Sequence, residues 1–445
     1  MGKISLMKKR FLLIVALIIF VTVNSVAQKP WGWRDCVNFA LENNIEIKNS
    51  SLISQEYKLN YQTSAFNLLP SFNAGSGLSY SIGRTIDYSD NGVVFNKNIL
   101  NNYGIYSQMG IFNSFSKLNQ LKFDKYNHLV SEADIEIKKN QVMFDVLNSF
   151  LSVALYKSLS VILNEKLKTT LEVYHRVDKM HDLGIKSGSD VIEMNAQVAA
   201  DSFLIDQNTS YLKQAFYRLM QAMNISSDTS FQIELPLLPS VYANIGNSKE
   251  TIDSAISFLP DIRRLEYQLE ASQRLLAIKR ASLLPSVNMN AGLQTGYYKN
   301  VDNNALSFQK QFENNANQYV GLSLNIPIFN GIYYRNNVKK AKIDVEIRQN
   351  DLERKILLLE IEVKKAISDL ELARNEYWSA IKQNDARQIA LEKAGKKYEK
   401  GLINIIEYNL IKTNATNSEF QVTNSSLQLF LKERTLAFFI NGSIL

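Results

Sequence analysis

The stretch NLLPSFNAGSGLSYS at residues 67–81 has a near copy, SLLPSVNMNAGLQTG, at residues 282–296. In each stretch a proline, Pro70 or Pro285, follows a segment of helical character and precedes a run in which apolar residues alternate with small or polar ones. Such alternation predicts a β-strand with one apolar face, because successive side chains of a strand point to opposite sides. The chain therefore changes from helix to strand in the same way twice.

The match between the two halves continues beyond these strands. With an offset of 217, the Ile-Phe-Asn motif at 111–113 falls on 328–330, and Gly184 falls on Gly401. The segment between the motif and the glycine therefore has the same length in both halves. A length kept to the residue indicates that the two halves pack side by side, and we interpret the chain as an internal duplication.

The segments that follow the paired strands are predicted to be long helices. They contain neither glycine nor proline between Ile111 and Leu183 or between Ile332 and Ala394, and they are rich in residues that favour helices. At about 1.5 Å per residue, a helix of about 70 residues reaches about 100 Å. Coiled coils and extended helical barrels have helices of this length, whereas compact globular domains do not need them.

Each repeat is predicted to contain a helix, two strands, a long helix, a tight turn and a further helix. The first repeat covers residues 28–223, with strands 71–84 and 102–112, the long helix 113–183 and the last helix 188–223. The second repeat covers residues 250–445, with strands 286–298 and 318–328, the long helix 332–399 and the last helix 404–440. Residues 224–249, which include two prolines, are predicted to connect the repeats.

Residues 1–27 are predicted to be a secretory signal peptide, because a basic segment precedes an apolar run that ends at the small residues Ser25 and Ala27. Its removal leaves 46 basic and 43 acidic residues, a net charge of about +3. No basic patch with interleaved aromatic residues is visible, so nucleic acid is not an expected partner. The single cysteine, Cys36, excludes an intramolecular disulfide, and we expect it to be buried on the first helix.

The predicted strands fit two environments. Alternating runs of about ten residues occur in transmembrane β-barrels and also in soluble hairpins with one buried face. The signal peptide, and the position of both hairpins at the same end of very long helices, favour the membrane. Four strands cannot close a barrel, and an open sheet edge in lipid leaves backbone groups without hydrogen bonds. Several chains must therefore share one barrel, but these residues alone do not choose their number.

The ordered set of motifs resembles the TolC family of outer-membrane efflux proteins over essentially the whole mature chain. The matching segments are the two LLPS switches, WRDCVNFALENNIEIKNS at 33–50, GLSLNIPIFNG at 321–331, DLGIKSGSDVIEMNAQ at 182–197 and YEKGLINIIEYNLIKTNA at 398–415. The resemblance implies a mainly α fold with a transmembrane β-barrel portion: a homotrimer whose twelve-stranded barrel lies in outer-membrane lipid and continues as a long α-helical barrel in the periplasm. It also implies docking to a periplasmic adaptor and, through that adaptor, to an inner-membrane RND or ABC transporter.

The resemblance further implies which residues form the periplasmic gate and the adaptor contact. The gate positions are Glu407, Asp190 and Tyr398, and the adaptor-contact tips are Gly184, Ile185, Gly401 and Leu402.

Two further gate positions differ from the family pattern, because Ile403 stands where the family has an arginine and Leu410 where it has a second acidic ring. A hydrogen bond between Tyr398 and Asp190 could survive, but the stronger charge-assisted contact could not. We expect a closed state held more by helix packing than by ions, with Glu407 as the main electrostatic constriction and a preference for cations. In the competing interpretations, Glu407 is a solvated helix acid, and Asp190 interacts with a helix N-terminus.

No pattern in the sequence predicts a catalytic site, a cofactor or a metal site. The three histidines lack metal-ligand spacing, and no nucleophile, phosphate-binding loop or carboxylate pair stands out. The sequence therefore favours an export channel for small molecules from a tripartite pump over an enzyme. Two alternatives stay open: the outer-membrane duct of a type I protein secretion system, and a periplasmic coiled-coil scaffold with soluble hairpins.

Overall fold

The computed structural model describes residues 30–86, 92–226, 231–236, 248–300 and 306–444. The predicted signal peptide at 1–27 and most of the predicted connection at 224–249 lie outside these ranges.

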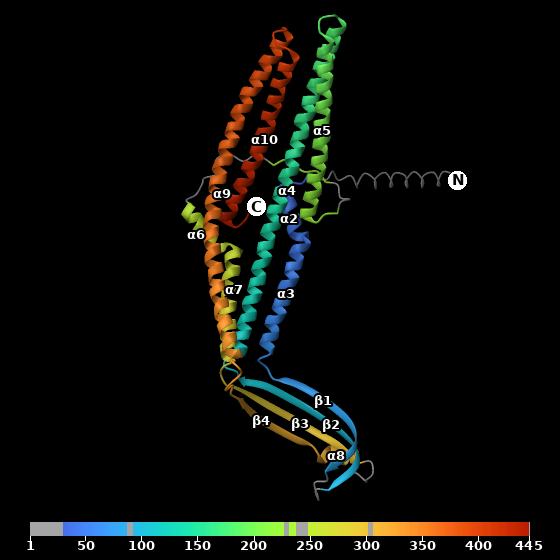
Figure 1. Cartoon of the computed structure of the whole chain (residues 1–445), viewed down its shortest axis with the longest axis vertical. Coiled ribbons are helices and arrows are strands. Elements are labelled where there is room, and N and C mark those ends of the chain that lie inside the picture. The colour runs from blue at the N-terminus through green and yellow to red at the C-terminus, as the bar shows by residue number, and fades with distance from the viewer. Residues whose placement is uncertain (1–29, 87–91, 227–230, 237–247, 301–305, 445) are drawn as a thin grey trace, which may run out of the picture. The chain divides into compact units, whose positions relative to one another are not determined.

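The described chain is mainly α-helical, with four strands (Figure 1). The first half contains α2 (Trp33–Asn43), α3 (Ile45–Phe66), β1 (Ser71–Ile86), β2 (Val93–Phe112), α4 (Ser116–Asp182) and α5 (Gly188–Met223). The second half contains α6 (Ser248–Phe258), α7 (Pro260–Ala281), β3 (Ser286–Asn300), α8 (Phe308–Asn314), β4 (Asn317–Asn325), α9 (Tyr333–Glu399) and α10 (Ile405–Asn441).

The helix bounds of the two halves coincide under a constant shift. Adding 215 to the bounds of α2 and α3 gives those of α6 and α7, and adding 217 to those of α4 gives those of α9. The turn between strand and long helix repeats as well, since Ser114 and Phe115 have φ of 52° and 63°, and Gly331 and Ile332 have φ of 61° and 70°. Two consecutive left-handed residues are uncommon, so the two halves share the backbone path of this turn as well as its length.

Each half has two helices before its first strand, where the sequence analysis predicts one. In the first half Asn44 interrupts the helix: its side-chain oxygen accepts the backbone N–H of Glu46 at 2.8 Å, and its amide donates to the carbonyl of Ala222 at 3.1 Å. In the second half Pro260 begins α7, where the missing N–H of proline costs nothing. The interruption therefore has a different local cause in each half.

The four strands form one antiparallel sheet in the order β1-β2-β3-β4. The register places two kinds of residue on opposite faces, since residues directly opposite each other share a face. The apolar face carries Phe72, Leu78 and Ile82 of β1, Ile99, Ile105 and Met109 of β2, Met289, Ala291 and Leu293 of β3, and Val320, Leu322 and Leu324 of β4. The other face carries mainly Gly, Ser, Asn, Gln and Tyr.

The strand β4 is shorter than its counterpart β2, and α8 precedes it. Beyond the last β3–β4 pair, Gln311 of α8 receives the backbone N–H of Tyr298 at 3.0 Å and donates to the Tyr298 carbonyl at 2.9 Å. Asn315 donates to the carbonyl of Gly296 at 2.8 Å. Side-chain amides of α8 and its C-cap thus bond to backbone groups at the edge of β3.

The observed strands differ most from the predicted ones at the start of β2 and at the end of β4. The strand predicted at 102–112 begins at Val93, and the strand predicted at 318–328 ends at Asn325. The early end has a simple cause: Pro327 has no N–H to donate to a neighbouring strand.

The chain divides into two compact units. The described residues of unit 1 lie within 30–48, 138–255 and 360–444, and those of unit 2 lie within 49–137 and 256–359, so α4 and α9 each contribute to both. The sheet belongs to unit 2.

The core of unit 1 is built where α4 meets α2 and α5, and it includes Cys36, Leu147, Phe150, Leu219 and Met223, all fully buried. Burial, with a smaller contribution from the charge of Asp35, raises the pKa of the Cys36 thiol to about 12. Cys36 is therefore a neutral core side chain, as expected from the sequence. Among the described residues, α4 contains a stretch whose mean hydropathy of 1.6 would suffice by length and composition for a membrane span.

Candidate functional site

The candidate site is the end of unit 1 where α4 turns into α5 and α9 turns into α10; we call the turns at 183–187 and 400–404 the tips. At the first tip, Gly184 has φ of 73°, and the N–H of Ile185 bonds to the carbonyl of Met180 at 2.8 Å. At the second, Gly401 has φ of 70°, and the N–H of Leu402 bonds to the carbonyl of Lys397 at 2.9 Å. These bonds and the left-handed glycine define a Schellman helix end. Both helices therefore stop by the same local mechanism.

Asp190 and Glu407 occupy equivalent places just after the tips. The N–H of Asp190 donates to the side chain of Ser187 at 3.2 Å, and that of Glu407 donates to the side chain of Asn404 at 2.8 Å. Both carboxylates therefore stand in the first turn of a helix, where a negative charge is favourable. Glu407 is exposed. This geometry agrees with the competing interpretation, in which Asp190 interacts with a helix N-terminus. Glu407 has the same geometry.

The tips expose apolar side chains to solvent. Leu183, Ile185 and Leu402 are each at least 66% exposed. Exposure of apolar surface to water is unfavourable, and burial against another protein would remove that cost. These three residues are therefore candidates for contact with another protein.

Behind the tips, the four helices α4, α5, α9 and α10 pack through a small apolar cluster. Its buried members are Val177, Met194, Tyr398 and Ile405, and Ile403 packs against them. Ile403, at the position where the resemblance implies an arginine, therefore adds to the apolar packing between the two hairpins.

The hydrogen bond between Tyr398 and Asp190 that the sequence left possible is absent. The Tyr398 ring stacks on the Tyr408 ring, with centroids 5.3 Å apart. It also contacts Lys186, whose Nζ lies 4.7 Å from the Tyr398 ring centroid. These ring contacts hold the side chain in a position where its hydroxyl is buried and has no hydrogen-bond partner among the described residues. Burial, followed by the negative charge of Asp190 and by Tyr408, raises the pKa of Tyr398.

One ion pair joins the two hairpins near the tips. Arg176 of α4 and Glu399 of α9 lie 3.2 Å apart, but their side chains are 53% and 60% exposed. Exposed ion pairs contribute about 0 to 1 kcal/mol. This contact is consistent with tips held mainly by packing.

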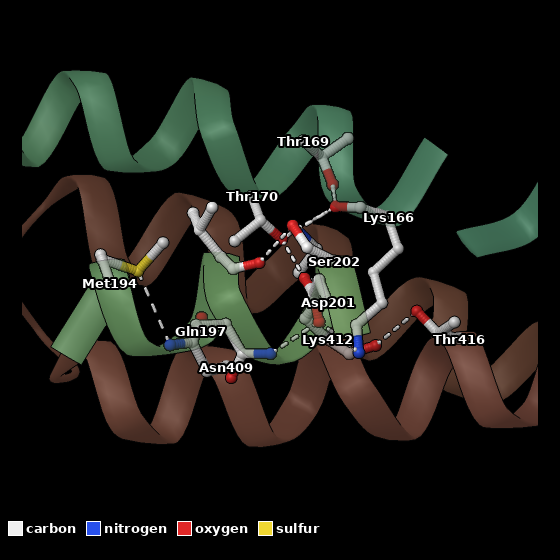
Figure 2. A network of polar contacts seen from close by, with 11 residues as sticks. Lys166, Thr169, Thr170, Met194, Gln197, Asp201, Ser202, Asn409, Lys412 and Thr416 are labelled. Carbon is white, nitrogen blue, oxygen red and sulfur yellow. Dashed lines mark hydrogen bonds and ion pairs between the residues drawn. The ribbon is translucent and has the colours of Figure 1, made fainter. Parts of the chain in front are cut away.

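Farther from the tips lies a polar group that the sequence analysis missed; we call Lys166, Thr170, Asp201 and Lys412 the buried lysine cluster (Figure 2). Lys166 Nζ lies 2.9 Å from Asp201 Oδ1, with the two side chains 6% and 1% exposed. Thr170 donates to the other carboxylate oxygen at 2.6 Å, and Gln197 donates to Oδ1 at 2.8 Å.

The third helix of the cluster is α10. Lys412 donates to the carbonyl of Lys166 at 3.1 Å and to the hydroxyl of Thr170 at 2.8 Å. Buried charges are rare unless paired, so Asp201 in the apolar context AADSFLI was a usable signal. Its partners lie on other helices, and no local pattern identifies them.

In the described part of the chain, no group of three or more His, Cys, Asp or Glu residues is arranged to hold a metal ion. The chemistry of the site is thus that of a helical end with apolar tips, acidic first turns and a buried polar contact between hairpins.

Comparison with known proteins gives these features a context. A family model described as Outer membrane efflux protein matches residues 251–442. The chain is 22% identical to the probable outer membrane lipoprotein SilC of Salmonella typhimurium over 388 residues, which cover 84% of this chain and 80% of SilC. It is 23% identical to the cation efflux system protein CusC of Escherichia coli over 398 residues, with the same coverage of 84% and 80%.

The fold matches solved structures over nearly the whole chain. The outer membrane protein VceC from Vibrio cholerae aligns with a TM-score of 0.81 at 12% identity, covering 93% of this chain and 97% of VceC. The chain is therefore similar to outer membrane efflux proteins, and the family model matches its second half. These matches support an outer-membrane channel for efflux. The resemblance to the TolC family is confirmed, and the alternative of a periplasmic scaffold is set aside.

Proposed function

We propose that three copies of this chain form one duct, with a twelve-stranded barrel in the outer membrane, through which a tripartite pump exports small molecules. The observation that carries the proposal is the four-stranded sheet of unit 2. In the described residues β1 pairs with β2 alone and β4 with β3 alone, so the sheet has two open edges.

The faces of the sheet support a membrane position. An apolar face and a face of small and polar residues suit lipid on one side and a water-filled lumen on the other. All nine residues of β4 are exposed in the single chain. Open edges cannot persist in lipid, because their N–H and C=O groups have no partner there. Pairing β1 of one copy with β4 of the next would satisfy both edges and close the barrel.

The helices of unit 2 also lack cover. On α3 the apolar side chains Leu52, Ile53, Leu59 and Phe66 are more than half exposed. A helix that is apolar on more than one face requires a second packing surface. A neighbouring copy supplies that surface in the proposed trimer.

The tips suit a docking role. The adaptor-contact residues Gly184, Ile185, Gly401 and Leu402 stand at the ends of the two helical hairpins, where Ile185 and Leu402 are exposed. We propose that a periplasmic adaptor binds there and connects the duct to an inner-membrane RND or ABC transporter. This role involves no catalysis by the chain.

Two relatives favour small cargo over secreted proteins. One is named as a cation efflux system protein and another, from Pseudomonas aeruginosa, as a pyoverdine export outer membrane protein. Both names refer to ions or small molecules. These names support the proposal that this protein exports small molecules.

The gate is proposed at the same end. Glu407 is exposed in the single chain, so three copies around an axis could present three carboxylates to the lumen and favour cations. Asp190 and Tyr398 would act beside it, through charge and packing rather than through a shared hydrogen bond.

Fractionation and conductance test the proposal. We expect the protein in the outer-membrane fraction, as a trimer in detergent that dissociates on heating, and as a channel in planar bilayers. The substitution Glu407→Gln should reduce the cation preference without abolishing conductance. Extraction as a soluble monomer would refute the duct, and unchanged selectivity of Glu407→Gln would refute only the gate assignment.

A further inference from the structure

The buried lysine cluster connects three helices of unit 1, and the gate residues do not account for it. Figure 2 shows Lys412 of α10 pointing into the same polar cluster as Lys166 of α4 and Asp201 of α5. Lys412 and Lys166 are both less than 9% exposed. The cluster is therefore a buried contact between the second hairpin and the first.

The charges of the cluster are unequal, because it has two lysines and one carboxylate. Asp201 forms the ion pair with Lys166 at 2.9 Å and accepts from Thr170 and Gln197. The two hydrogen bonds of Lys412 go to neutral acceptors, the Lys166 carbonyl and the Thr170 hydroxyl. Lys166 and Asp201 thus balance each other within the α4–α5 pair, and Lys412 is a surplus cation.

This stoichiometry makes one interface easier to open than the other. If α10 moves away, Lys412 enters water and the α4–α5 pair keeps its balanced charges. If α4 and α5 separate, Lys166 and Asp201 lose each other, and an uncompensated charge in a protein interior is strongly unfavourable. The apolar cluster behind the tips has members on all four helices and does not favour one of these two separations over the other. The difference in the cost of separating charges therefore favours movement of α10.

We propose that Lys412 is a positioning residue of the gate: burial of its surplus charge weakens the docking of α10 on α4 and directs opening to the interface between α10 and the α4–α5 pair. We call this releasable contact the tether. The inference rests on the proposed function, because it assigns a moving part to the proposed gate. Lys412 positions α10 and with it Glu407, which stands in the first turn of the same helix.

The tether responds to pH. Burial lowers the pKa of Lys412 to about 8, Lys166 also lowers it, and Asp201 and Glu172 raise it. These three are the charged groups that face Lys412, two from α4 and one from α5. On release into water the pKa returns toward 10.5. The docked state therefore holds its proton less tightly than the released state, and docking strengthens as pH rises above about 8.

Single-channel recording tests the tether. Open-state occupancy of the wild type should fall about tenfold or more from pH 7 to pH 9.5, since one pKa unit corresponds to a factor of about ten. Lys412→Met removes the buried charge, so its occupancy should be at least about tenfold lower than that of the wild type at pH 7 and nearly independent of pH. Lys412→Gln keeps a donor without the charge and should show the same loss of pH dependence.

Lys432→Met is the matched control. It makes the same substitution on the same helix but removes a partly exposed ion pair with Asp369. It should keep the pH profile of the wild type. If Lys412→Met opens as often as the wild type at pH 7, or keeps its pH dependence, the tether is wrong even though the channel exists.

Hydrogen exchange separates this inference from the proposed function. At pH 7 the amides of residues 405–416 should exchange at least about threefold more slowly in Lys412→Met than in the wild type, because α10 docks more firmly. If the wild type forms no channel, the proposed function fails while this measurement still decides on the tether. Unchanged exchange in Lys412→Met would overturn it.

Discussion

The two halves of the molecule share their helix bounds and differ in the polar contacts inside them. With the offset of 217, Asp201 of α5 corresponds to Ser418 of α10. Asp201 holds the buried ion pair with Lys166, whereas the hydroxyl of Ser418 donates to the side chain of Asn384 at 3.0 Å. The same helical hairpin therefore accommodates an ion pair in one half and a neutral hydrogen bond in the other. Helix packing, rather than a particular polar partner, maintains the hairpin.

The strands differ in the same way. β2 has 20 residues, and its counterpart β4 has 9 and is preceded by α8. The backbone of β3 is satisfied by a strand on one edge and, at its far end, by amide side chains on the other. A duplicated fold can thus exchange a strand for a short helix where hydrogen bonds to the exposed edge are replaced.

The largest expected difference between the halves concerns Asp201. Asp201→Ala leaves two lysines buried without a counter-charge and should cost about 3–5 kcal/mol of stability. Ser418→Ala, at the matching position, removes one neutral hydrogen bond and should cost about 1 kcal/mol. Denaturant unfolding in detergent, followed by helical circular dichroism, compares them. Equal losses of stability in Asp201→Ala and Ser418→Ala would mean that the buried ion pair contributes no more than a neutral hydrogen bond.

The edge of β3 should be the next most sensitive. Gln311→Leu removes both hydrogen bonds to Tyr298 and should cost about 1–2 kcal/mol locally, because partly buried backbone groups lose their partners. Gln309→Leu, on the same helix but paired with the exposed Glu313, should cost less than about 0.5 kcal/mol. Proteolysis of residues 306–316 measures the local loss. Equal cleavage of both variants would refute the capping role of α8.

The two tips should respond alike. Gly184→Ala and Gly401→Ala each force a side chain into a left-handed conformation and should cost about 1–2 kcal/mol. Gly395→Ala is the control, because it lies within α9 with no atom within 4 Å of an added methyl group, and it should stabilise by up to about 1 kcal/mol. Thermal unfolding ranks the three variants. A large difference between the two tips would show that their turns are not equivalent.

The smallest effect is expected at Tyr398. Tyr398→Phe removes a buried hydroxyl without a partner, so stability at pH 7 should stay the same or rise by up to about 1 kcal/mol. Burial raises the pKa of Tyr398 above 10.0, so the unfolded chain loses this proton first and stability falls as pH rises above about 10. Tyr398→Phe should make this alkaline loss smaller. If the wild type and Tyr398→Phe show the same dependence of stability on pH between pH 9 and 11.5, the raised pKa of Tyr398 is contradicted.

The parts of the fold that depend on neighbours in sequence follow from the sequence. The helix ends at Gly184 and Gly401 are marked by the glycine itself, and both long helices end two residues before these glycines. The end of β4 before Pro327 is a local effect as well, although the sequence analysis extended that strand past the proline. The interruptions at Asn44 and Pro260 had local signals that the prediction of a single helix overlooked.

The contacts inside the candidate site depend on distant residues. Asp190 and Tyr398 are near each other, as the family resemblance implies, since the charge of Asp190 affects the Tyr398 hydroxyl. Their hydrogen bond is absent because Tyr408 and Lys186 hold the ring elsewhere. The motif around Tyr398 alone does not show whether the side chain bonds to Asp190 or packs against Tyr408 and Lys186.

By itself, the sequence determined the duplication, the mainly helical class with four strands and the apolar alternation of those strands, because spacing and periodicity are properties of neighbouring residues. Only the tertiary structure brought Lys166, Asp201 and Lys412 together and placed Gln311 at the edge of β3. Burial and pairing of a charge depend on helices that are far apart in the chain, and their energies exist only once those helices pack.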